Sequence, residues 1–90
     1  MRKPTISQFV QALVHPSKNN GTDVATAVIT RVFSPIQAGD DAAWCVNARL
    51  LLDSPDTDWV TSVYVYESEE IARAHQATPL QVCLYWPASI

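Results

Sequence analysis

Glycine and positive charge are both scarce in this chain of 90 residues. It contains two glycines, Gly21 and Gly39, and six lysines and arginines against nine aspartates and glutamates. Two isolated glycines exclude the glycine-rich loops that cradle phosphate groups. A formal net charge of −3 disfavours binding to a nucleic-acid backbone, which depends on clustered lysine and arginine side chains. We therefore expect no direct contact with nucleic acid.

Long apolar runs are also missing. No stretch approaches the roughly 18 apolar residues that cross a bilayer, so we expect no membrane contact. Polar residues and a proline interrupt any apolar segment behind Arg2 and Lys3, which predicts no secretory signal and a cytoplasmic location. An apolar fraction of 48% with 17% charged residues is typical of a folded chain, and this length predicts one domain over 1–90.

Cysteine and histidine are too few and too scattered for a recurring metal site. Cys45 and Cys83 lie far apart, with no Cys-x-x-Cys pair, and His15 and His75 do not complete a known ligand spacing. Neither histidine has a nucleophile or a carboxylate at the spacing of a catalytic motif. We expect two free thiols, no metal, no cofactor and no catalytic residue.

Hydrophobic periodicity predicts the order helix, three strands, helix, strand. Apolar residues recur at helical spacing from Ile6 to Val14, and Thr5 and Gln8 have capping-box spacing. Alternating and β-branched runs predict the strands. Ser68, followed by two glutamates, predicts the start of the second helix. The predicted elements are helices over 5–14 and 68–76 and strands over 23–33, 42–53, 59–66 and 80–86.

These elements predict a single-domain α+β fold. Short polar connections between the central strands favour an antiparallel sheet of about four strands, with two helices packed on one face. Alternation along the strands assigns three large side chains, Trp44, Trp59 and Trp86, to the core.

Negative charge is concentrated in one part of the chain. Residues 1–31 sum to +3, residues 32–90 sum to −6, and six of the nine acids lie between 53 and 70. Regularly placed carboxylates can stand in for phosphates, so this segment is a candidate surface for a basic partner, such as the nucleic-acid-binding surface of another protein. The alternative is that the acids solvate a turn and cap a helix. The candidate residues are Asp53, Asp56, Asp58, Glu67, Glu69 and Glu70.

The less apolar faces of the strands form a second candidate surface. Tyrosines fall there together with arginine, asparagine and glutamine, a mixture typical of recognition surfaces. Such faces are hidden economically in a homodimer, which we expect for so short a chain. The alternative is a sheet that helices cover on both sides. The candidate residues for contact with a partner or a second copy are Arg49, Tyr64, Tyr66 and Tyr85.

Together these features predict a non-enzymatic protein-binding domain. We expect a small inhibitor or accessory protein, of the type found in phages and mobile elements, whose acidic segment engages a basic surface of a partner protein. The alternative is a small-molecule-binding or enzymatic α+β domain with its pocket at a dimer interface. That pocket would be lined by Asn47, Arg49, Tyr64 and Tyr85.

Overall fold

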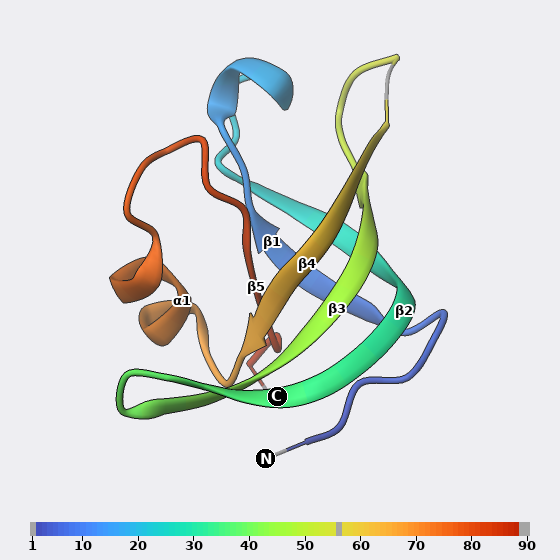
Figure 1. Cartoon of the computed structure of the whole chain (residues 1–90). Helices are drawn as coiled ribbons and strands as arrows, with labels where there is room; N and C mark the ends of the chain where they lie inside the picture. The colour runs from blue at the N-terminus through green and yellow to red at the C-terminus, as the bar shows by residue number, and fades with distance from the viewer. Residues whose placement is uncertain (1, 56, 89–90) are drawn as a thin grey trace.

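The strands of this chain close into a small β-barrel (Figure 1). The computed structural model describes residues 2–55 and 57–88. Within these ranges a 3-10 turn, η1, and a single α-helix, α1, accompany the strands. The predicted α+β fold, with two helices on one face of an open sheet, is therefore wrong. The elements are β1 (Phe9–Leu13), η1 (Pro16–Lys18), β2 (Val24–Ala38), β3 (Asp41–Leu51), β4 (Asp58–Tyr66), α1 (Glu69–His75) and β5 (Cys83–Tyr85).

The shortest strand, β5, closes the barrel. β1 to β4 form an antiparallel meander, and β5 pairs antiparallel with β1 and parallel with β4. A parallel pair needs a crossover connection, and the segment 67–82 provides it, with α1 inside it. The prediction of a wholly antiparallel sheet therefore fails at the β4–β5 pair.

The helix predicted over 5–14 is also wrong, although its capping contact exists. Gln8 Oε1 accepts a hydrogen bond from Thr5 N at 3.0 Å, as it would in a capping box. Ser7 has a φ of 75°, in the left-handed region, so the chain cannot continue as a helix there. It extends instead as β1, with β2 on one side and β5 on the other. Both faces of β1 carry buried apolar side chains, so apolar residues recur along the sequence at intervals that resemble those of a helix.

The second strand is longer than predicted, because it passes through a serine and a proline without ending. β2 shifts register against β3 around Thr30 and again around Phe33. Such bulges bend a strand, and here they carry β2 around the barrel. Pro35 is tolerated because this half of β2 pairs with β3 alone. Its other edge therefore needs no backbone N–H, the group that proline lacks, to donate to a neighbouring strand.

The remaining elements lie close to the predicted ranges. β3 and β4 follow the predicted strands over 42–53 and 59–66, whereas the last strand shortens to β5. Ser68 caps α1 as predicted: its Oγ accepts a hydrogen bond from Ile71 N at 3.3 Å. Glu69 and Glu70 occupy the first turn, where the helix dipole favours negative charge.

Two apolar clusters stabilise this arrangement. The first fills the barrel, whose narrow interior accommodates small side chains such as Ala12, Ala27 and Ala48, all fully buried. The second lies outside the barrel wall, beneath α1, and contains Leu13, Ala43, Tyr66, Ala72, Cys83 and Tyr85. Over the described ranges, no helix is long and apolar enough to cross a membrane.

Candidate binding surface

The outward side of β3 forms the middle of an exposed face. Alternation points Val46, Ala48 and Leu50 into the barrel, where they are buried. The residues between them, from Cys45 to Leu51, therefore face away from the interior. This confirms that one side of the predicted strand over 42–53 packs in the core and the other meets solvent.

Side chains on the two neighbouring strands widen this face. Trp59 on β4 and Val28 on β2 are the cross-strand partners of Arg49, while Tyr64 is the partner of Cys45. Several of these side chains are exposed, with 55% of Trp59 accessible to solvent. We call this set the outer-face patch. It comprises Val28, Arg31, Phe33, Arg49, Leu51, Trp59 and Tyr64.

The placement of Trp59 on this surface corrects the prediction that it lies in the core. A bulge in β4 sets Thr61 and Ser62 together opposite Asn47, between the pairs Val46–Val63 and Ala48–Val60. Ser62 has a φ of 53°, and Asn47 Oδ1 accepts a hydrogen bond from its N–H at 3.0 Å. The extra residue reverses the alternation, so that Trp59 and Tyr64, five positions apart, point to the same side.

The other two tryptophans contact the barrel core. Trp86 is buried, and Trp44 is half-buried against the same cluster. Each carries a cation on its ring: Arg2 Cζ lies 4.4 Å from the Trp86 ring centre, and Lys3 Nζ lies 5.7 Å from that of Trp44. These contacts hold the N-terminal segment against the barrel.

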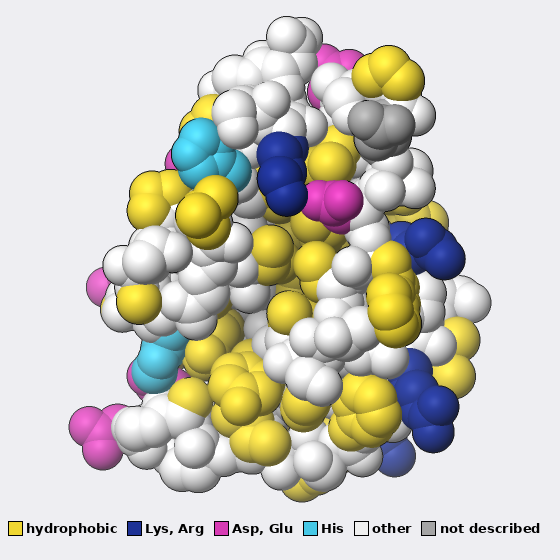
Figure 2. Space-filling model, turned by 45° about the horizontal axis from the view of Figure 1, so that its top comes forward, with side chains coloured by type: hydrophobic (Ala, Val, Ile, Leu, Met, Phe, Trp, Pro, Cys, Tyr) yellow, Lys and Arg dark blue, Asp and Glu magenta, His cyan; other side chains and the backbone are white. Residues whose placement is uncertain are grey.

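Charges are segregated over the molecular surface. On the outer-face patch, Arg31 Cζ lies 5.3 Å from the Phe33 ring centre, and Arg49 lies between Val28 and Trp59. Neither arginine forms an ion pair with a carboxylate of residues 2–55 or 57–88. Figure 2 shows dark blue and yellow side chains together along its right flank, whereas magenta side chains lie at the left, at the top and in the upper centre, there beside a dark blue one.

The acidic residues predicted to form one binding surface lie at two ends of β4. Asp53 and Asp58 lie at the end beside η1, where Asp58 pairs with Lys18 at 3.3 Å and Asp53 accepts a hydrogen bond from Asn20 Nδ2 at 3.1 Å. Eight strand residues, roughly 26 Å of extended chain, separate Asp58 from the acids at the start of α1. There Glu69 pairs with Arg73 at 2.8 Å, while Glu67 and Glu70 are exposed. Asp56 lies outside the described residues.

Two of the predicted sheet-face tyrosines are covered by α1. Tyr66 and Tyr85 belong to the cluster beneath this helix, and Tyr66 is only 2% exposed. Tyr66 stacks on His75 with ring centres 4.7 Å apart, and His75 Nε2 lies 2.8 Å from Asp41 Oδ2. These contacts fasten the end of α1 to the β2–β3 hairpin. The structure thus brings Arg49, Asn47 and Tyr64 to one face but places Tyr85 elsewhere.

Burial of Tyr66 makes the protein sensitive to alkali. Desolvation, assisted by the charges of Cys83, Tyr64 and Asp41, raises the pKa of Tyr66 from 10.0 to about 12. Between these values the unfolded chain loses the phenolic proton and the folded chain keeps it, so stability falls as the pH rises. Burial also raises the pKa of Cys83 and of Tyr85, in the same direction.

We expect Tyr66→Phe to reduce the loss of stability between pH 10 and pH 12, because phenylalanine has no proton to lose. Urea unfolding followed by circular dichroism at a series of pH values measures this slope. Wild type and variant are compared at neutral pH as well, to separate any change in packing. An unchanged alkaline slope in Tyr66→Phe would contradict the assignment.

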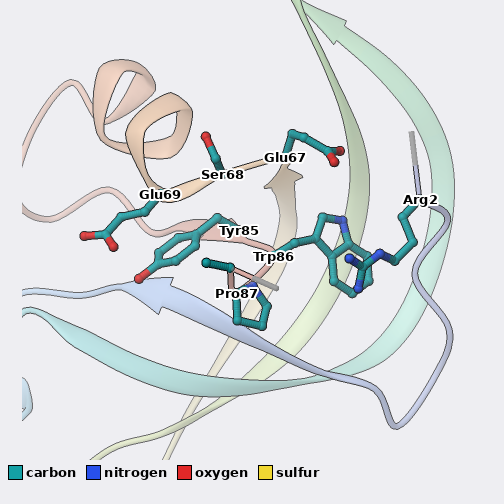
Figure 3. A pocket seen from close by; sticks show the side chains of 8 residues that line it. Arg2, Glu67, Ser68, Glu69, Tyr85, Trp86 and Pro87 are labelled. Atoms are coloured by element: carbon teal, nitrogen blue, oxygen red, sulfur yellow. The ribbon is translucent and has the colours of Figure 1, made fainter. Parts of the chain in front are cut away.

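A hollow at one end of the barrel is the second surface feature (Figure 3). Trp86 forms part of its wall, with the guanidinium of Arg2 against the indole, and Trp86 Nε1 is buried with no hydrogen-bond partner among the described residues. Glu67 and Glu69 line the hollow but point in opposite directions in Figure 3. The polar groups therefore do not converge as they do around a bound small molecule.

Potential catalytic and metal-binding groups are dispersed over the described parts of the chain. These residues include no cluster of three or more histidine, cysteine or acidic side chains able to hold a metal ion. His15 Nδ1 accepts a hydrogen bond from Ser17 N at 3.1 Å, at the start of η1. Cys45 is half-buried on β3, Cys83 is buried on β5, and both are free thiols.

The function of this chain is inferred from the geometry described above. No protein-family model, no curated protein and no solved structure matches the chain significantly.

Proposed function

We propose that this chain is a non-enzymatic protein-binding domain and that it binds through the outer-face patch. The observation that carries the proposal is the exposed Trp59 next to Arg49, on a face that also presents Phe33 and Leu51. Tryptophan and arginine are the residues most often responsible for binding energy at protein interfaces.

The composition of the whole patch supports this assignment. Its members are aromatic, aliphatic or arginine, Cys45 and Asn47 on the same face of β3 are uncharged, and none of these residues is lysine, aspartate or glutamate. Interface cores show the same enrichment in aromatic residues and arginine, and the same depletion of lysine and acids. A surface that only met solvent would gain nothing from exposing Trp59, Phe33 and Leu51 together.

The enzymatic alternative receives less support from the geometry. Of its four pocket residues, Asn47 is engaged with the Ser62 bulge, and Tyr85 is buried beneath α1. The two free thiols accord with a reducing compartment, so a cytoplasmic location belongs to the proposal.

Selection from a random peptide library displayed on phage tests the proposal. We expect the folded chain to enrich peptides that bind Trp59→Ala at least about tenfold more weakly, because truncating a central aromatic anchor typically costs that much. The matched control is Leu80→Ala, since Leu80 is 74% exposed in the α1–β5 connection, outside the patch. Thermal unfolding confirms that both variants are folded.

Two results would contradict the proposal. One is the absence of any enrichment over an unrelated immobilised protein. The other is a set of enriched peptides that bind Trp59→Ala as tightly as the wild type, since these would use another surface.

A further inference from the structure

The charge of the outer-face patch points to the chemistry of its partner. We propose that the patch takes an acidic protein segment, in which aspartate or glutamate side chains lie next to a large apolar residue. This inference rests on the proposed function and specifies the partner of the same site.

The first step concerns the six cations. Lys18 and Arg73 are neutralised within the chain, by Asp58 and by Asp23 and Glu69 respectively. Arg2 and Lys3 lie on the rings of two tryptophans at the N-terminal segment. The arginines of the outer-face patch, Arg31 and Arg49, likewise have no carboxylate in an ion pair within residues 2–55 and 57–88, and these two lie together on one exposed face of the barrel wall.

The second step concerns what these two arginines can bind. A guanidinium presents parallel N–H donors that match both oxygens of a carboxylate, and such charge-assisted pairs give orientation as well as affinity. Stacking of Arg31 on Phe33 limits the freedom of its side chain before binding. Leu51 and Trp59 lie on the side of Arg49 away from Arg31, where they offer apolar contact to a residue next to the carboxylates.

A nucleic-acid strand fits this surface less well. Strand binding depends on a track of cations that follows successive phosphates, together with stacking aromatic rings. The patch has the rings but only two arginines, and the chain carries a net charge of −3 that repels a long polyanion. A short acidic segment needs only the two contacts that the patch offers.

A second copy of the chain also fits poorly. In a face-to-face dimer with twofold symmetry, the same patch lies on both sides, so arginines approach arginines. Docking the patch of one copy on the acidic end of another would be head-to-tail, which generates open chains unless the rotation closes into a ring.

Sequencing of the peptides selected above tests the inference. We expect those selected by the wild type to be enriched in aspartate and glutamate around leucine, phenylalanine or tryptophan. Selection on the double variant Arg31→Gln, Arg49→Gln should keep the apolar enrichment and lose the acidic one. Arg73→Gln is the matched control, because Arg73 lies on α1, outside the patch, and it should select acidic peptides as the wild type does. Raising the salt concentration should weaken the acidic peptides, since exposed charge pairs are screened.

The outcomes separate this inference from the proposed function. Selected peptides that depend on Trp59 but show no acidic excess would overturn the inference and leave the proposed function intact. Absence of any Trp59-dependent peptide would overturn both. Displacement of the peptides by micromolar mixed-sequence single-stranded DNA would assign the patch to nucleic acid instead. A dimer seen by light scattering and abolished by Trp59→Ala would assign it to a second copy.

Discussion

Replacing Leu84 with alanine should lower the free energy of unfolding by about 2–5 kcal/mol, the range found for leucine truncation in a packed core. Leu84 is fully buried in the barrel interior and is the middle residue of β5. It is the register partner of Ala12 on β1 and of Val65 on β4, so its side chain packs where the barrel closes. The truncation leaves a cavity at that seam.

Urea unfolding followed by circular dichroism measures this loss. The control, Leu80→Ala, removes the same atoms from an exposed position in the preceding connection and should change stability by less than about 0.5 kcal/mol. A loss below about 1 kcal/mol in Leu84→Ala would show that β5 contributes little to closure.

Replacing Asn19 with alanine should cost about 2–4 kcal/mol, because one buried side chain satisfies three backbone groups. Asn19 Nδ2 donates to the carbonyl oxygens of Thr22 and Val24 at 3.1 and 3.0 Å, and Asn19 Oδ1 accepts from Asp53 N at 2.6 Å. These bonds shape the loop before β2 and join it to the segment that follows β3. Asn19 is the buried polar residue of the described chain.

Two variants sharpen this experiment. Asn19→Asp keeps an acceptor for Asp53 N but faces two carbonyl oxygens with a carboxylate, so it should also destabilise. Asn20→Gly is the control: Asn20 is exposed, donates a single hydrogen bond to Asp53 Oδ2 and has a φ of 51°, which glycine adopts without strain, so the change should cost less than about 1 kcal/mol. Equal stabilities of Asn19→Ala and Asn20→Gly would contradict the role of Asn19.

Short sequence patterns predicted the elements that depend on residues close together in the chain. Alternation placed β3 and β4 within a few residues, and Ser68 with two glutamates marked the start of α1. Closure into a barrel depends on a three-residue strand that pairs with partners far along the chain, and no short pattern encodes such pairing. β1 was mistaken for a helix because tertiary contacts bury both of its faces.

The candidate surface was predictable in part, for the same reason. Arg49 and Tyr64 were expected on an exposed sheet face, and both lie there. Trp59 was assigned to the core because regular alternation along the strand points it inward. The bulge that turns it outward occurs at Ser62, and serine is not a residue type that indicates a positive φ. Tyr66 and Tyr85 were expected to be exposed, because no sequence pattern indicates that α1 packs over them. That position of α1 depends on closure of the barrel.

The Ser62 bulge has a consequence for solubility as well as for side-chain direction. On the side away from β3, β4 pairs with β5 only through Val65 and Tyr66, so within the described chain the rest of that side has no strand partner. A straight strand with an open edge is a template for pairing with other chains and for aggregation. The left-handed kink at Ser62 interrupts the regular spacing of donors and acceptors along this edge. The residue that turns Trp59 outward thus also protects the unpaired part of the β4 edge from unwanted strand addition.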